Sequence, residues 1–289
     1  FSVLTKAGLS YSTLTCTGLP AGDFRKVGGG VGLQKSEWKR EVGSMVPFEA
    51  QMRVPEDVLV AARAENGELT DGDVLASEAI KTMRGSTLRI GAQTWYGAKI
   101  SADGFAGLST QVDAGNVVNA GGNAGADSSS VYLVNLAADP VNPEGVHYVL
   151  GNSGRMNFKD MWGEQQIETN PGTKLFSNVF TNNFLAYLGL VVPRPEAIYK
   201  IKNVVAGSPF TDLIGAETKS LLPLGLRGDL GSWRWFMNST AHHLLHKSRI
   251  TIAQNGAGAS YVPEPVDVCG IKIQLTDSLV TTERAGLKP

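Results

Sequence analysis

The first 55 residues constrain the fold most, because they contain too few apolar side chains to bury a core of their own. A turn-forming Pro-Ala-Gly-Asp segment at residues 20–23 and a run of glycines at residues 28–30 interrupt any regular pattern. Basic side chains are interspersed here, namely Arg25, Lys26, Lys35, Lys39 and Arg40. The segment is therefore predicted to form an extended arm and a long hairpin that a neighbouring subunit, rather than the chain's own core, holds in order.

A long helix is predicted from about residue 70 to residue 96. It begins at Thr70 and Asp71, where a short polar side chain can cap the free backbone amides. Apolar and small side chains then recur at three- and four-residue steps, namely Ala76, Ala79, Ile80, Met83, Thr87, Ile90 and Thr94. We expect this to be the longest helix of the protein and to cross a sheet with its Ile80–Met83–Ile90 face.

The chain becomes β-rich after a Gly/Asn/Ser loop at residues 115–130. Short apolar runs predict strands at residues 131–136 and 146–150, and an aromatic-rich run predicts one at residues 232–237. Alternation of Ala197, Tyr199 and Ile201 with lysines predicts a half-buried strand. Residues 176–192 are expected to be its hairpin partner. Helices are predicted at residues 211–222 and 239–248.

The last predicted strand, residues 266–275, has a change of pattern. Val266 and Val268 share one parity, whereas Ile271 and the apolar residues after it share the other. Gly270 lies at the change, and a β-bulge with positive φ there would keep both halves facing the core. Cys269 is then expected to be a small buried apolar residue.

The charge balance argues against a dedicated nucleic-acid-binding surface. The chain has 26 basic and 27 acidic residues and a formal net charge of −1, whereas neutralising phosphates requires an excess of Lys and Arg. Its two cysteines, Cys16 and Cys269, are far apart, so we expect free thiols. The longest strongly apolar run, residues 184–192, is shorter than the roughly 20 residues of a membrane helix. DNA would be contacted non-specifically at most, and no membrane partner is expected.

Three histidines on one predicted helix, His242, His243 and His246, are the main candidates for a metal site. A four-residue step places His242 and His246 on one face. A zinc protease would require Glu in place of His243 and a further ligand beyond the helix. Polar surface is therefore the simpler interpretation.

Two glycine-rich segments are superficially similar to catalytic or phosphate-binding loops. Ser153 lies in a Gly-Asn-Ser-Gly stretch, but the only preceding histidine, His147, is too near in sequence for a chymotrypsin-like protease, and a hairpin turn is favoured. Residues 28–32 lack the preceding strand and the Gly-Lys-Ser/Thr of a phosphate loop. We predict no catalytic, cofactor-binding or metal-binding residues, and hence no enzyme.

A series of short segments resembles the major capsid protein family of tailed double-stranded DNA phages, especially a group common in short-tailed phages. The segments are residues 24–32, 53–55, 95–97, 105–108, 130–134, 146–149, 188–195, 201–204, 235–240, 269–273 and 276–283. Their shared order, more than any one of them, carries the resemblance, which spans residues 22–283. It implies an α+β chain with the Hong Kong 97-type capsid fold, in which residues 130–134 and 146–149 belong to one β-hairpin.

The resemblance also implies a division of the chain. The expected parts are an N-terminal arm (1–20), an extended loop (21–60), a peripheral domain with the long spine helix (61–205), an axial domain (206–262), and the closing strand of the peripheral domain with a tail (263–289).

The implied function is self-assembly into hexamers and pentamers of an icosahedral virion shell that encloses the phage genome, formed in the host bacterial cytoplasm. Portal, scaffolding and decoration proteins are the expected further partners. Two alternatives stay open: an encapsulin-like nanocompartment shell and a β-rich adhesin or binding module.

Overall fold

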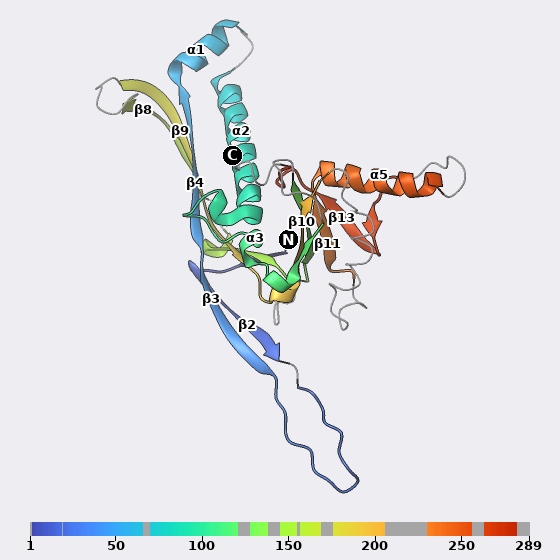
Figure 1. The fold of residues 1–289 in the computed structure, drawn as a ribbon. Helices are drawn as coiled ribbons and strands as arrows, with labels where there is room; N and C mark the ends of the chain where they lie inside the picture. Colours follow the sequence, from blue (N-terminus) through green and yellow to red (C-terminus); the bar gives the residue numbers. More distant parts are fainter. Residues whose placement is uncertain are drawn as a thin grey trace.

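The computed structural model describes residues 2–18, 20–65, 70–120, 128–137, 145–154, 157–168, 176–205, 230–255 and 263–281. Over these residues helices and sheets form a body from which a long hairpin projects (Figure 1). The helices are α1 (Glu56–Glu65), α2 (Asp71–Tyr96), α3 (Leu108–Gln111) and α5 (Ser239–Asn255), with 3-10 turns η1 (Gly97–Lys99), η2 (Ala114–Asn116), η3 (Asn152–Gly154) and η4 (Pro195–Ala197). The strands are β1 (Ser2–Thr5), β2 (Ser10–Gly18), β3 (Glu37–Ser44), β4 (Val46–Pro55), β5 (Val117–Asn119), β6 (Ser129–Asn135), β7 (His147–Leu150), β8 (Asn157–Glu168), β9 (Phe176–Val191), β10 (Ile198–Val204), β11 (Trp233–Met237), β12 (Asp267–Val268) and β13 (Ile271–Leu275).

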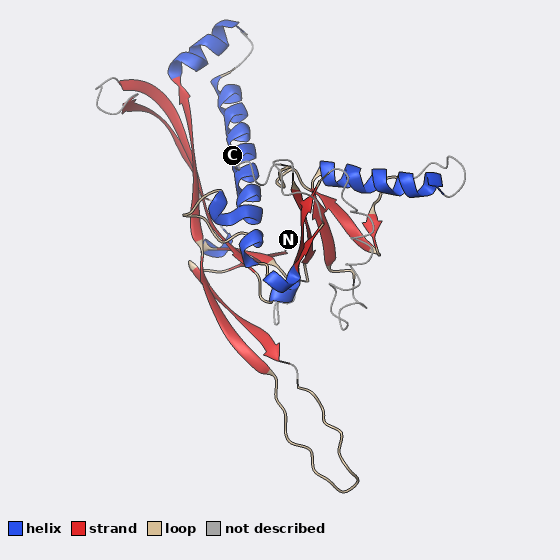
Figure 2. Ribbon diagram, in the orientation of Figure 1, coloured by secondary structure: helices blue, strands red, loops and turns tan. Residues whose placement is uncertain are grey.

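These strands form two large sheets and one two-stranded ribbon. The first sheet has the order β1-β7-β9-β4, and β8 also pairs with β9. The second has the order β12-β13-β11-β6-β10-β5, and β2 pairs with β3 to make the ribbon. In this mixed α+β architecture α2 runs along the first sheet, whereas α5 lies beside the second (Figure 2).

The long helix begins and ends as the sequence predicts. Thr70 and Asp73 form a reciprocal capping box, in which the Thr70 hydroxyl accepts from the Asp73 amide at 3.3 Å and the Asp73 carboxylate accepts from the Thr70 amide at 3.0 Å. The Thr70 hydroxyl also donates to the Asp73 carboxylate at 2.6 Å, and this bond, together with the one from the Thr70 amide, lowers the pKa of the Asp73 carboxyl. Gly97, with φ of 55°, ends the helix. At 26 residues, α2 is the longest helix in the described part of the chain.

The expected sheet-facing side of α2 is correct only in part, because Met83 and Ile90 line hollows shared with β4 and β9 whereas Ile80 does not. Ile80 and Met83 are 67% and 45% exposed. The row of α2 side chains that is buried on the first sheet includes Leu75 and the small residue Ser86. Leu75 packs with Met52 and Val54 of β4. Each residue turns an α-helix by about 100°, so this buried row of side chains lies beside the row that the apolar periodicity predicts. Small polar residues can approach a sheet closely, and an analysis of apolar periodicity alone overlooks them.

The prediction that residues 1–55 lack packing on their own subunit is correct for only part of the segment. Residues 20–36 form a loop without strand or helix. By contrast, β1 pairs in parallel with β7, and β4 pairs with β9 over its whole length. Met52 and Val54 of β4 are buried in the core. Alternation along residues 46–55 therefore marks a core strand rather than part of an arm.

Two predicted hairpins are replaced by pairings between strands distant in sequence. β6 lies in the second sheet between β11 and β10, whereas β7 lies in the first sheet between β1 and β9, so they form no hairpin. β9 likewise pairs with β4, β7 and β8 rather than with β10. The expected 115–130 loop contains the short strand β5, which pairs in parallel with β10.

The central strand of the second sheet carries the main core. Val131 and Leu133 of β6 face one cluster, which includes Trp233 and Trp235 of β11 and Leu245 of α5. Tyr132 and Val134 face the opposite cluster, which joins this sheet to the end of α2 and to Leu190 of β9. Every residue of β6 is buried, which explains its continuous apolar run.

Strand β11 and helix α5 confirm the predictions at residues 232–237 and 239–248, with α5 extending to Asn255. The predicted helix at residues 211–222 lies outside the described residues. The Gly-Asn-Ser-Gly stretch is not a hairpin turn. It includes η3, which separates β7 from β8, and both strands pair with the same edge of β9.

The predicted bulge at Gly270 is wrong, although its positive φ is confirmed. Cys269 and Gly270, with φ of 53° and 81°, form the two-residue turn of a hairpin in which Val268 pairs with Ile271. Positive φ at both central residues is typical of a type I′ turn. The chain reverses here, so Val268 and Ile271 reach the same core without a bulge. Cys269 is exposed at the turn, not buried.

Substituting Gly270 tests this turn. A Cβ there would meet only Leu230 Cδ1, at 3.6 Å, so the cost of a side chain is conformational rather than steric. Gly270→Val is expected to lower the free energy of unfolding by about 1–3 kcal/mol, because valine disfavours positive φ. Gly270→Asn should retain most of the stability, since Asn tolerates this region. Urea denaturation measures the free energy of unfolding of both variants. Equal values for the Val and Asn variants would contradict a turn that requires positive φ at residue 270.

Candidate assembly surfaces

The loop at residues 20–36 exposes most of its large apolar side chains completely, while Val31 is 47% exposed. Phe24, Val27 and Leu33 are 109%, 107% and 106% exposed. The described contacts within the loop are polar: Arg25 donates to the Gly29 carbonyl at 2.8 Å, and Gln34 donates to the Asp23 carboxylate at 3.1 Å. The loop extends from the free end of the β2–β3 ribbon, away from both large sheets (Figure 1). A single chain therefore gives these apolar groups nothing to pack against.

The ribbon itself has an apolar face. Leu14, Trp38 and Val42 are each about half exposed or more, at 54%, 52% and 69%. The register places Leu14 opposite Arg40 and Val42 opposite Ser12, so all three share one side of the ribbon. An exposed apolar face on a two-stranded ribbon is typical of a surface that another molecule covers.

The base of the ribbon is fixed to the first sheet. The Met45 amide donates to the Leu9 carbonyl at 2.8 Å, and Met45 packs with Val149 and Val191. The Tyr11 ring lies across Gly43, where a Cβ would come within 2.3 Å of the ring. Gly43 therefore allows the aromatic side chain to cross the ribbon and reach this cluster. These contacts set the direction in which the ribbon projects.

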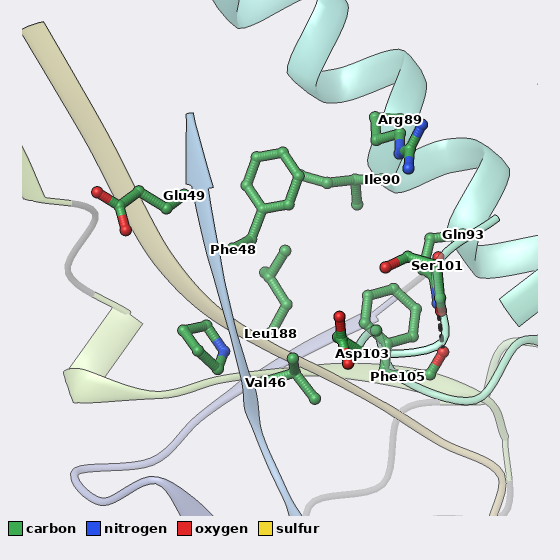
Figure 3. A pocket seen from close by; sticks show the side chains of 12 residues that line it. Val46, Phe48, Glu49, Arg89, Ile90, Gln93, Ser101, Asp103, Phe105 and Leu188 are labelled. Atoms are coloured by element: carbon green, nitrogen blue, oxygen red, sulfur yellow. Dashed lines mark hydrogen bonds between the residues drawn. The ribbon is translucent and has the colours of Figure 1, made fainter. Parts of the chain in front are cut away.

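A pocket of about 260 Å³ opens beside this base. Its walls come from the start of β4, from α2, from residues 101–105 and from β9. Figure 3 shows the apolar side chains of Phe48, Ile90, Phe105 and Leu188 converging on it. The pocket cannot be predicted from the sequence, because its walls come from four separate segments and no motif marks it.

The polar side chains of the pocket differ in their hydrogen bonds and ion pairs. The Gln93 amide donates to the carbonyls of Ser101 and Phe105, at 3.3 and 2.8 Å. Arg89 donates to the Ile100 carbonyl at 3.2 Å. The carboxyl of Asp103 is exposed, and among the described residues no ion pair involves it. The pocket thus combines an apolar interior, side chains that donate to backbone carbonyls, and a carboxylate at its edge.

The histidines considered for chemistry lie on α5 and on β7. His242 Nε2 lies 2.9 Å from the Pro265 carbonyl, and His243 is exposed on α5. Within the described ranges, no group of three or more His, Cys, Asp or Glu side chains could hold a metal ion. His147 lies in β7, hydrogen-bonded to the Gly145 carbonyl, and its burial lowers its pKa. None of the helices in the described segments is long and apolar enough to cross a membrane.

Comparison with known proteins gives a family and a fold. The model of the family described as major capsid protein GP7 matches residues 5–285. A chain from the structure of bacteriophage Epsilon15 is similar with a TM-score of 0.62 and 14% identity, covering 96% of this chain and 84% of that chain. A chain from the capsid of bacteriophage JBD30 has a TM-score of 0.54 and 12% identity, covering 96% and 88% of the two chains. No curated protein matches this sequence.

The family match covers nearly the whole chain, and the described elements have the architecture of these phage structures. The expected α+β fold of the Hong Kong 97 type is confirmed. The expected structural role in a virion shell is confirmed as well. The chain therefore belongs to the major capsid protein GP7 family of tailed phages and is a self-assembling shell protein of the virion capsid.

Proposed function

We propose that this chain assembles into hexamers and pentamers of an icosahedral shell around double-stranded DNA, and that the loop at residues 20–36 holds neighbouring copies together. The observation that carries the proposal is the complete exposure of Phe24, Val27 and Leu33 on a ribbon with a fixed base. Apolar groups in this position gain stability only when another copy covers them. Repetition of such contacts around a ring or shell multiplies modest affinities.

The proposed role is structural, without catalysis. A net charge of −1 suits a wall that faces packed DNA without binding it tightly. Portal and scaffolding proteins, and possible decoration proteins, belong to the proposal as further partners. The family match favours a phage shell over a nanocompartment or an adhesin.

We propose a division of the subunit that follows its sheets. The first sheet with α2 and the ribbon would form the peripheral part, and the second sheet with α5 would form the axial part. Support comes from β11, which lies between β13 and β6 in one continuous sheet. The boundaries expected from the sequence would assign these three strands to three different parts of the chain. Because the strands are neighbours in one sheet, we group them together.

Sedimentation of the purified chain tests the assembly proposal. The expected result is a concentration-dependent conversion from single subunits to capsomers and then to fast-sedimenting particles, since weak repeated contacts give cooperative assembly. A chain that stays monomeric over the whole accessible concentration range would contradict the proposal.

A further inference from the structure

We propose that the pocket beside the base of the ribbon receives Phe24 from the loop of a second copy of this chain. This inference rests on the proposed function, because it names the place where the loop of one copy docks on the next. Every subunit contains both the Phe24 side chain and the pocket, so each copy can dock on one neighbour and receive the loop of another.

The pocket has the size and surface that an aromatic ring requires. Its volume is about 260 Å³, and a cavity of roughly 150 Å³ lined by aliphatic and aromatic side chains already holds benzene. Phe48, Ile90, Phe105 and Leu188 provide apolar contact on several sides (Figure 3). Phe24 is the largest apolar side chain on the loop, and it is 109% exposed in the single chain.

The polar groups of the pocket also fit this occupant. The Gln93 amide already donates to two backbone carbonyls and the Arg89 guanidinium to one, so an apolar ring that enters the pocket can leave these hydrogen bonds in place. Asp103 lies at the pocket, and Glu49 also lines it. Lys26 lies two residues from Phe24 and begins the turn that the Gly29 amide closes on the Lys26 carbonyl, so the lysine and the ring lie at the same end of the loop. Its ammonium group could therefore approach these carboxylates when the ring is seated.

The length of the ribbon and loop explains why the occupant comes from another copy. Gly28 lies 16 residues before Ser44, at the ribbon base, and at about 3.3 Å per residue an extended chain of that length spans roughly 50 Å. A compact chain of this size has a diameter of roughly 50 Å, taken from its expected radius of gyration. The loop points away from its own pocket and reaches about one subunit further (Figure 1). Such a head-to-tail contact, when the rotation closes, generates rings.

Paired cysteines test the contact in assembled shells. In the Phe24→Cys/Asp103→Cys variant, mild oxidation is expected to link successive copies and to give a ladder of covalent oligomers on a non-reducing gel. Phe24→Cys/Val60→Cys is the matched control, since Val60 is 54% exposed on α1 but does not line the pocket. Both variants retain the two native cysteines, so the background is the same. An equal yield of oligomers from the two pairs, in shells that assemble normally, would overturn the inference.

Wild-type shells provide a second measurement if the cysteine variants do not assemble. A cryo-EM map at side-chain resolution is expected to show a phenyl ring from one copy in the pocket of the next. Shells in which that pocket is empty, or is filled by another residue, would contradict the docking and leave the proposed function standing. Failure of the wild-type chain to form shells would instead contradict the proposed function itself.

Discussion

Replacement of residues 20–36 by a short turn is expected to abolish shell formation while the subunit stays folded. The loop makes no described contact with either large sheet, and its largest side chains are fully exposed, so its removal costs the subunit little stability. In the shell the same side chains would become buried, and each large apolar group that loses its partner costs about 1.5–3 kcal/mol per contact. A shell repeats that loss at every copy. Sedimentation should show single subunits, and thermal melting should stay close to that of the wild type.

Two variants of unchanged loop length separate the role of the apolar groups from that of the loop itself. The triple variant Phe24→Ser, Val27→Ser and Leu33→Ser should also fail to assemble. Substitution of Gly22 and Gly30 by Ser should have little effect, since a Cβ at either position meets nothing within 4 Å in the subunit. Normal shells from the triple variant would show that the loop does not hold copies together through these side chains.

Gly107→Ala is expected to destabilise the subunit more than the other single substitutions considered. A Cβ at Gly107 would lie 2.3 Å from the Gly97 nitrogen and 2.9 Å from the Gln93 carbonyl oxygen. All of these are backbone atoms at the end of α2, so a rotamer change relieves nothing. The expected cost is about 3 kcal/mol or more, because the segment at residues 105–108 must move away from the helix end. The midpoint of thermal unfolding should fall by roughly 6 °C or more.

Gly115→Ala is the matched control for this substitution. Gly115 is exposed in η2, and a Cβ there meets nothing within 4 Å. Its stability should therefore equal that of the wild type within about 0.5 kcal/mol. Equal stability of the Gly107 and Gly115 variants would show that the close approach of the two backbones is absent.

Local chemistry explains which elements could be predicted from the sequence. The bounds of α2 follow from the Thr70 capping box and from Gly97, whose signals lie within a few residues of each helix end. The Gly270 turn shows the limit of this reasoning. A change of apolar parity occurs both at a bulge and at a two-residue reversal, and positive φ suits either one. Only the pairing of Val268 with Ile271 distinguishes them.

Strand partners could not be predicted, because they depend on contacts far apart in sequence. β4 and β9 pair over Val46–Pro55, although more than a hundred residues separate them. The apolar runs of β6 and β7 are close in sequence, and a hairpin turn between them would place both strands in one sheet. In the structure β6 belongs to the second sheet and β7 to the first. The candidate pocket could not be predicted for the same reason. Its apolar side chains come together only when these strands are paired, namely Phe48, Ile90, Phe105 and Leu188.

Cryo-EM of particles formed by the purified wild-type chain tests the central claim most directly. The account predicts closed icosahedral shells in which the loop at residues 20–36 of each copy lies on the next copy of the same capsomer. The result that would contradict it is a map of closed shells in which this loop contacts no other copy, or a preparation that contains only separate folded subunits.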